Sequence, residues 1–209
     1  MKSMTKRLLA ALLAVAALFA LVGCGKSDKA DAAPKDYTKI LHDARPDEDN
    51  EYYMIFSPGE DGKFTAQYGS SDSYDAAQLD EEIRNMLLPL LNLEEDMYTD
   101  FAASVSGMMV QSYGIAIVKP AEGKQQAVSE ALDAYVQSQM QSMEHYLEDQ
   151  YQIAASSHIS TAPTGEVILV CCENPEAVMN AIKTALDPQH ILNNGKSYLT
   201  GGNNNAGTF

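Results

Sequence analysis

Val167-Ile168-Leu169-Val170 is a run of apolar residues without a polar break, inside a segment from Glu166 to Cys172. Short runs of this kind, rich in β-branched residues and bounded by turn residues, are typical of buried strands. Pro163-Thr164-Gly165 comes directly before the run and has the composition of a turn. Residues 151–162 on the other side of that turn are predicted to be extended, so the two segments should pair as a hairpin.

Amphipathic helices are predicted on both sides of this hairpin in the chain. The helix after it is well delimited, with Asn174 as N-cap, Pro175 at the first helical position and a stop at Asp187-Pro188. A longer helix is predicted before the hairpin, because apolar residues recur there at helical spacing. Its methionines suit core packing better than an adaptable binding surface. The stripe consists of Val128, Leu132, Tyr135, Val136, Met140, Met143 and Leu147.

Three further elements are predicted upstream of the long helix. Helical periodicity begins near Tyr74, and Pro89 should bend or end that helix. A second short helix is predicted from Glu94 to about Ser106, because Met97, Phe101 and Val105 would share one of its faces. Residues 110–118 are rich in Ile, Val and Tyr and are predicted to form a strand.

Two apolar-aromatic runs lie still earlier in the chain, at residues 52–56 and 64–68. A segment containing Pro58, Gly59 and Gly62 separates them, which predicts a β-hairpin. Aromatic residues in a small hairpin usually pack on the main domain, but Tyr52, Tyr53 and Phe56 are also candidates for contacting a sugar or peptide partner. The acidic segment 47–51 lacks the glycine of a calcium loop and is predicted to be a solvated loop.

These elements predict an α+β fold. Its small antiparallel sheet is covered by amphipathic helices, in the order helix, helix, strand, long helix, hairpin, helix. Only one ordinary domain fits into the chain once its N-terminal segment is removed. The predicted organisation is a signal peptide at 1–23, a lipidated cysteine and flexible spacer at 24–36, an extension with the aromatic hairpin at 37–73, a core domain at 74–188 that should fold alone, and a low-complexity tail at 189–209.

The N-terminal residues combine the zones of an exported lipoprotein. Lys2, Lys6 and Arg7 form a basic start, and Leu8 to Val22 is an apolar run of 15 residues without a charge. A membrane-spanning helix needs about 20 apolar residues, so the run suits a signal peptide better than a permanent span. Leu21-Val22-Gly23-Cys24 closes it and looks like a lipobox.

A lipobox implies that Cys24 receives diacylglycerol, with palmitate as a typical acyl chain, and becomes the N-terminus after cleavage behind Gly23. Two acyl chains hold a protein firmly on a bilayer, whereas one binds only reversibly. The protein is therefore expected on the extracytoplasmic face of the cell membrane, anchored by lipid. An ordinary cleaved signal, a short uncut anchor and a buried helix are the alternatives.

Charge and cysteine content narrow the classes of function. Without the three basic residues of the signal region, 11 basic residues face 29 acidic ones, a net charge of −18. Such a surface repels phosphate backbones, so nucleic-acid binding is not expected. It suits solubility and would tolerate cationic partners or divalent ions. Cys171 and Cys172 are adjacent, so a disulfide between them would be strained.

No residue pattern nominates a catalytic, cofactor or metal site. The histidines lack the i, i+4 spacing of a helical zinc site, and the cysteines have no C-x-x-C partner. A G-x-S-x-G nucleophile motif and a complete phosphate-binding loop are also missing from the sequence. Carboxylates are so numerous that no catalytic pair can be selected from them.

The chain resembles the small lipoproteins of Gram-positive bacteria that carry domain of unknown function 4358. Four stretches carry the resemblance: Leu93 to Tyr98, Tyr113 to Pro120, Tyr146 to Tyr151 and Val167 to Val170. Residues 36–73 depart from that pattern. The resemblance implies export and a compact α+β domain, but no activity.

Two hypotheses of function follow. The first is a non-enzymatic, lipid-anchored binding or accessory module that contacts a surface protein or wall ligand. The second is a surface hydrolase or solute-binding component that uses acidic residues. A single short domain lacks the interdomain cleft of a solute receptor, which favours the first. A pocket with convergent carboxylates of perturbed pKa would favour the second.

Overall fold

The computed structural model describes residues 35–108 and 110–188. The signal peptide, the lipobox with Cys24, most of the spacer and the tail from residue 189 lie outside the described residues, so those predictions are untouched by the structure. Within the described part, no helix is long and apolar enough to cross a membrane. The described residues from Asp36 onward belong to one compact unit.

A six-stranded antiparallel sheet forms the centre of this unit, in the order β2-β1-β3-β4-β6-β5. Three of the pairs join strands that are consecutive in sequence, whereas β1 pairs with β3 and β4 pairs with β6. The predicted hairpin partner of the Val167–Val170 run is confirmed, because His158 to Thr161 pairs with Val170 to Val167. The strands are β1 (Ile55–Pro58), β2 (Phe64–Gln67), β3 (Tyr98–Val105), β4 (Gly114–Pro120), β5 (His158–Thr161) and β6 (Val167–Cys171).

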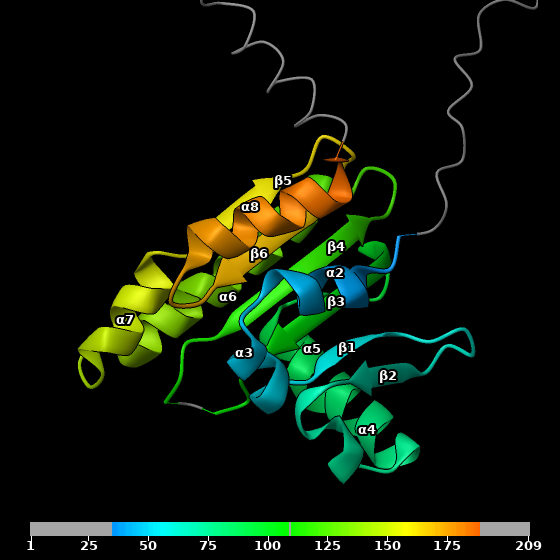
Figure 1. The fold of residues 1–209 in the computed structure, drawn as a ribbon, viewed down its shortest axis with the longest axis horizontal. Coiled ribbons are helices and arrows are strands. Elements are labelled where there is room, and N and C mark those ends of the chain that lie inside the picture. The colour runs from blue at the N-terminus through cyan, green and yellow to red at the C-terminus, as the bar shows by residue number, and fades with distance from the viewer. Residues whose placement is uncertain (1–34, 109, 189–209) are drawn as a thin grey trace, which may run out of the picture. The chain divides into compact units, whose positions relative to one another are not determined.

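Helices cover both faces of the sheet (Figure 1). One face carries α4 (Ala76–Glu82), the π-helical turn η2 (Ile83–Leu87), α5 (Leu88–Leu90) and α6 (Gln125–Met143). The other carries α2 (Tyr37–Ala44) and α8 (Pro175–Leu186), which pack beside each other. The remaining helices are α3 (Asp47–Tyr52), the short 3-10 turn η1 (Gly69–Ser73) and α7 (Glu148–Ala155). The predicted α+β class with an antiparallel sheet is confirmed.

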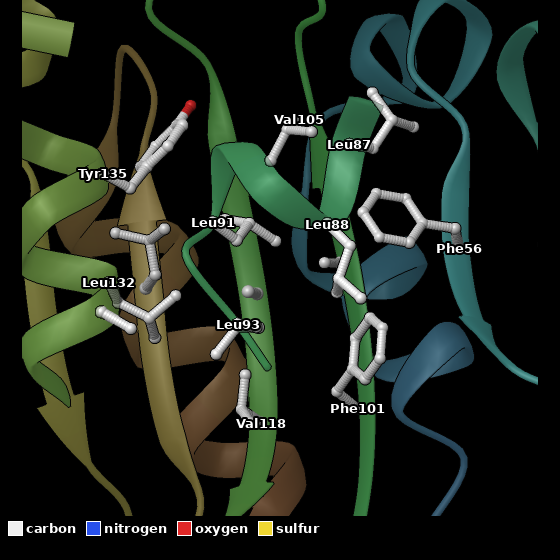
Figure 2. Packing of buried hydrophobic residues seen from close by; sticks show 14 of the residues in the cluster. Phe56, Leu87, Leu88, Leu91, Leu93, Phe101, Val105, Val118, Leu132 and Tyr135 are labelled. Carbon is white, nitrogen blue, oxygen red and sulfur yellow. The ribbon is translucent and has the colours of Figure 1, made fainter. Parts of the chain in front are cut away.

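The core under α6 and α5 is built from alternate residues of the central strands. Phe101, Val105 and Val118 point to this face, and Leu88 and Leu91 cover them (Figure 2). Leu132 and Tyr135 reach the same cluster from α6. The long helix buries most of the predicted apolar stripe, including Val136, whereas Met140 is only partly buried and Leu147 lies beyond the end of α6 at Met143.

The opposite face buries the residues between those positions, as the two-residue period of a strand requires. Ile115 and Ile117 of β4 and Ile168 and Val170 of β6 belong to this second cluster. Because β4 and β6 are covered on both faces, they read as continuous apolar runs instead of alternating ones. The residues of α2 and α8 in this cluster are Tyr37, Leu41, Val178, Met179, Ile182 and Leu186.

The segment from Asp75 to Leu90 shows how the sequence sets local structure. Asp75 caps α4, because its side chain accepts from the backbone N–H groups of Ala77 and Gln78. The Gln78 side-chain oxygen in turn accepts from the backbone N–H of Asp75, which completes a capping box. A π-turn follows, and the helix ends one residue after Pro89. Proline removes a helical donor and clashes with the preceding turn, where the π-turn lies, and the left-handed backbone of Asn92, with φ of 54°, marks the end of the helix.

The predicted short helix from Glu94 to Ser106 is wrong, because residues 98–105 form β3 in the middle of the sheet. Phe101 and Val105 share a face in a strand as well as in a helix, since they are four residues apart. Ala102, Ala103 and Ser104 lie between them and are all small and buried. The sequence therefore does not alternate between apolar and polar residues, as it would in a strand with one exposed face. Pairing with β1 and β4 decides the outcome.

Two other local predictions are corrected. Residues 47–51 were predicted to be a loop but lie in α3, where Asp47, Glu48 and Asp49 occupy the first turn and favour the positive end of the helix dipole. The extended segment predicted at 151–162 begins only at His158, because α7 continues to Ala155. The strand predicted from residue 110 begins at Gly114.

The predicted aromatic hairpin is confirmed as β1 and β2, paired over four residue pairs from Ile55–Gln67 to Pro58–Phe64. It is joined to the later strands, because Phe56 of β1 pairs with Ala103 of β3. Arg84 links the hairpin to η2: its guanidinium donates to the Gly62 carbonyl at 2.6 Å and lies 4.7 Å from the centre of the Phe64 ring.

Candidate functional site: an acidic cavity at one end of the sheet

A cavity of about 500 Å³ lies where the end of β6, the start of α8, the loop before β4, and helices α3 and α7 meet. These segments gather at the same end of the sheet in Figure 1, although they come from distant parts of the chain. We call this space the acidic cavity. It is lined by Pro46, Glu48, Asp49, Tyr52, Tyr53, Met108, Gln111, Ser112, Tyr113, Gln150, Ile153, Cys172, Glu173, Asn174 and Val178.

Tyrosines form one wall of the acidic cavity. The rings of Tyr53 and Tyr113 are stacked, with centroids 3.9 Å apart and planes inclined by 12°. Tyr113 is buried and Tyr53 half-buried, whereas Tyr52 is 66% exposed at the end of α3. Met108 from the loop after β3 is also exposed and lines the same space. The cavity therefore offers apolar surface to whatever enters it.

A buried arginine holds this wall in place. The Arg45 guanidinium donates to the Tyr53 carbonyl at 2.6 Å and to the Tyr113 hydroxyl at 3.2 Å. It also donates to the Asn50 side-chain oxygen at 2.6 Å and to Ser104 Oγ at 2.7 Å. A buried guanidinium is costly unless its donors are satisfied. Arg45 meets that need with four partners and thereby fixes α3 against β3 and the start of β4.

The charged groups that line the acidic cavity are all carboxylates: Glu48, Asp49 and Glu173. Burial raises the pKa of Asp49, and the nearby Glu48 and Glu173 charges act in the same direction. A hydrogen bond from Tyr113 and the Arg45 charge oppose that rise. Asp49 is thus a partly desolvated carboxyl whose ionised form would gain from an added positive charge.

The Ser112 hydroxyl is a buried polar group without a hydrogen-bond partner among the described residues. Ser112 itself is 2% exposed. The backbone N–H of Ser112 is satisfied, since it donates to Gln150 Oε1 at 2.9 Å. A buried hydroxyl without a partner costs roughly 1–3 kcal/mol. Because Ser112 lines the acidic cavity, a bound ligand could satisfy it.

Two of the three residues predicted to contact a partner lie at the acidic cavity, and the third lies in the core. Tyr52 and Tyr53 line the acidic cavity. Phe56 is fully buried, 5.9 Å from Phe101 in an edge-to-face arrangement, and no partner can reach it in this fold. The alternation of β1 explains this correction, because Phe56 points into the core beneath α5.

Sequence reasoning missed Asp49, Ser112 and Tyr113 as members of a site. Asp49 had been placed in a solvated loop, and Ser112 and Tyr113 in a strand. One usable signal was present: Arg45 and Pro46 precede the acidic residues, and an Asp-Glu-Asp sequence behind a proline suits a helix start. The cavity itself brings together segments more than 100 residues apart, such as those of Asp49 and Glu173, and short-range patterns carry no information on such an arrangement.

The cysteines and the possible metal ligands of the sequence do not form a second site among the described residues. Cys171 and Cys172 are both buried and free. Burial raises the pKa of the Cys172 thiol to about 11 and also raises that of Cys171, so neither is an activated thiolate. Among the residues that the structure describes, no three His, Cys, Asp or Glu side chains are grouped in a way that could hold a metal ion.

Residues 70–173 match the model of the family described as a domain of unknown function, DUF4358. The match extends from η1 to the residue that follows Cys172, and it leaves α2, α3, β1, β2 and α8 outside. Comparison with curated proteins and with solved structures found no match to the chain.

The family match divides the acidic cavity into two parts. Met108, Ser112 and Tyr113 come from the matched residues, together with Gln150, Cys172 and Glu173. Asp49, Tyr52 and Tyr53 precede the match and Asn174 and Val178 follow it, so they form the part outside it. The chemistry of this cavity therefore depends on residues that the family model does not describe.

Proposed function

We propose that this chain is a lipid-anchored binding protein on the extracytoplasmic face of the cell membrane, and that it holds its ligand in the acidic cavity without transforming it. The lipobox ending at Cys24 and the charged spacer support the location. An anchor of this kind would hold the acidic domain within reach of surface proteins, wall material and solutes.

One observation carries the binding function: an accessible cavity of about 500 Å³ is lined by Ser112, whose buried hydroxyl has no partner among the described residues. Buried polar groups are satisfied in the great majority of cases, and an exception asks for a missing partner. The cavity volume lies within the range of small-molecule sites. The notion that a one-domain protein lacks a receptor cleft loses its force, because this cavity forms inside one domain.

A ligand screen tests the proposal. The purified full chain would be screened by ligand-observed NMR against small molecules and short peptides that span anionic, neutral and cationic groups. Gln111→Trp should abolish binding of the hits, because Gln111 lines the cavity and an indole there would occupy it. Gln137→Trp on the exposed side of α6 is the matched control and should bind normally. Hits that survive Gln111→Trp equally well would contradict binding in the cavity.

A second candidate is a hydrolase that uses Asp49 as a general acid. The raised pKa of Asp49 and the convergence of Glu48 and Glu173 on the same cavity favour it. Screening the full chain against peptide, glycan and ester substrates decides between the candidates. Turnover that Asp49→Asn abolishes would establish the hydrolase, whereas binding without turnover supports the binding protein.

A further inference from the structure

We propose that the ligand of the acidic cavity is an organic cation, a protonated amine on an apolar stem. The amine lies against Asp49 and Ser112, and the stem lies against Tyr52 and Tyr53. This inference rests on the proposed binding function and specifies its ligand class. The amine belongs either to a small molecule or to a lysine side chain of a partner, because both present the same alkylammonium group.

The charge of the lining excludes the opposite ligand class. Glu48, Asp49 and Glu173 line the cavity, and no Lys or Arg is among the described lining residues. The nearby Arg45 is buried, and its donors are occupied by Asn50, Ser104, Tyr113 and Tyr53. An anion entering the cavity would meet three carboxylates and no free positive group, so it would be repelled. A cation would be attracted over the same distances.

The tyrosines favour an organic cation over a hydrated metal ion. Aromatic faces attract ammonium groups and cover alkyl chains at the same time. Tyr52 is exposed enough to close over a ligand, and Tyr53 is held by its stack on Tyr113. The grouping of carboxylates that a metal ion needs does not occur among the described residues.

Ser112 supplies an observation that is independent of the charges. An ammonium group has three N–H donors and no acceptor, whereas a hydroxyl oxygen accepts. The Ser112 hydroxyl is almost fully buried and is not bonded to any described residue. An amine between Asp49 and Ser112 would satisfy both the carboxylate and this hydroxyl. An apolar ligand without a polar head would leave the hydroxyl unsatisfied.

The test uses two cationic probes and their neutral counterparts. Cadaverine represents a small amine, and the tripeptide Gly-Lys-Gly with blocked termini represents a lysine side chain. N,N′-diacetylcadaverine and the same tripeptide with acetyl-lysine keep the stems but lack the charge. Binding to the full chain is measured by isothermal titration calorimetry at low ionic strength. At least one cationic probe should bind about tenfold more tightly than its acetylated form, and the probe that does so identifies the source of the amine.

Variants assign the binding to the cavity. Asp49→Asn should weaken the cationic probe about tenfold, whereas Asp133→Asn on the exposed side of α6 should leave it unchanged. Both variants have the same net charge, so a difference between them reports position and not the overall field of the protein. Tyr52→Leu should weaken binding severalfold. Tyr146→Leu, at a tyrosine that is 87% exposed and outside the cavity, should not.

Ser112→Ala separates a binding hydroxyl from a structural one. The variant should be as stable as the wild type or more stable, because it removes a buried group without a partner, yet it should bind the cationic probe severalfold more weakly. A structural hydroxyl would instead lose stability when removed.

Two results would overturn the inference. If acetylated probes bind as tightly as cationic ones at a position that Gln111→Trp blocks, the cavity binds ligands but does not select cations, and the proposed function survives. If cationic probes bind equally to wild type, Asp49→Asn and Asp133→Asn, or do not bind at millimolar concentration, the organic cation is excluded. The broader ligand screen then decides the proposed function separately.

Discussion

The ring of Tyr53 lies flat on the ring of Tyr113, with 3.9 Å between their centroids. Tyr53 follows α3, and Tyr113 precedes β4, so the stack joins the N-terminal segment to the centre of the sheet. Arg45 contacts the backbone of one and the hydroxyl of the other. The same contacts that stabilise the junction therefore position the aromatic wall of the acidic cavity, and a change in either tyrosine affects folding and binding together.

Tyr113→Phe keeps the stack and removes the hydroxyl. The free energy of unfolding should fall by about 1–2 kcal/mol, because Arg45 loses one of its buried acceptors. The pKa of Asp49 should rise further, since the hydrogen bond from Tyr113 that lowers it is lost. Chemical denaturation and an NMR titration of the Asp49 carboxyl measure the two effects. An unchanged pKa would show that the hydroxyl does not act on Asp49.

Gly114→Ala should destabilise the protein next to Tyr113, because a side chain at position 114 would collide with Tyr135. A Cβ at position 114 would lie 2.6 Å from the Tyr135 hydroxyl oxygen, and Tyr135 is 1% exposed. That hydroxyl donates to the Tyr113 carbonyl at 2.8 Å, so the ring cannot move without losing a buried hydrogen bond. The expected loss is about 1–3 kcal/mol of unfolding free energy by chemical denaturation.

The matched control for Gly114→Ala is Gly107→Ala. An added Cβ at position 107 would have only a Leu87 methyl group within reach, at 3.9 Å. Its effect should be small, and the double variant Gly114→Ala, Tyr135→Leu should recover part of the stability lost by Gly114→Ala alone. Equal losses at the two glycines would show that close packing of Tyr135 is not the cause.

Much of the fold was predictable where one pattern dominates. The Val167–Val170 strand, the stripe of α6 and the proline-started α8 each combine a clear period with clear end signals, and all three are confirmed. β3 was not predictable in this way, because Ala102, Ala103 and Ser104 are small and are buried by pairing with strands on both sides. The strand is specified by its neighbours, and only the assembled sheet contains them.

The candidate site was less predictable than the fold. Tyr52 and Tyr53 were candidates because aromatic residues are enriched where proteins contact partners, and they do line the cavity. Asp49 was one of 29 acidic residues, and nothing in its local sequence separates it from the others. Its distinction comes from partial burial beside Arg45 and Tyr113, which is a property of the tertiary structure.

A fragment of residues 74–188 should fail to fold, although the sequence suggested an independent core there. It lacks β1, which pairs with β3, and α2, which covers the second face of the sheet. Removing α2 would expose Ile115 and Ile117 to water and delete the bond from the Tyr37 hydroxyl to Glu166 at 3.0 Å. Circular dichroism and NMR dispersion should show a folded fragment 36–188 and a disordered fragment 74–188. Two equally well-folded fragments would contradict this expectation.

Cys24→Ala should stop lipidation and maturation while leaving the domain folded. The reason is that Cys24 is the only residue of the lipobox with a thiol to receive the diacylglycerol. Detergent phase partitioning and mass spectrometry of wild type and variant measure the result. An unmodified Cys24 in the mature wild-type protein would refute the anchor.

The stability of the protein and its affinity for a cation should depend on pH in opposite ways because of Asp49. Burial raises the pKa of Asp49 above that of the unfolded chain, so the folded state holds this proton more tightly. Ionisation of Asp49 therefore costs stability, and the cost develops as pH rises from about 4, the pKa of an unperturbed aspartate, through the raised folded value. The free energy of unfolding of Asp49→Asn minus that of the wild type should therefore be more positive at pH 7 than at pH 3. Urea denaturation at the two pH values measures this difference.

Binding of the cationic probe should follow the opposite trend. A cation favours the ionised carboxylate, so binding lowers the pKa of Asp49 and releases a proton at acidic pH. Affinity should fall as pH decreases through the raised pKa, and the fall should be shallower in Asp49→Asn. Calorimetry in buffers of different ionisation enthalpy counts the released proton. The groups that act on this titration besides the ligand are Arg45, Glu48, Tyr113 and Glu173.

Glu48→Gln and Glu173→Gln complete the assignment of that proton. If Asp49 carries it, proton release should persist in both glutamine variants and disappear in Asp49→Asn. Loss of proton release in Glu173→Gln alone would move the cation to the start of α8. An affinity that does not vary with pH in the wild type would mean that the ligand avoids these carboxylates altogether, and the tyrosine wall would then have to account for all of the binding.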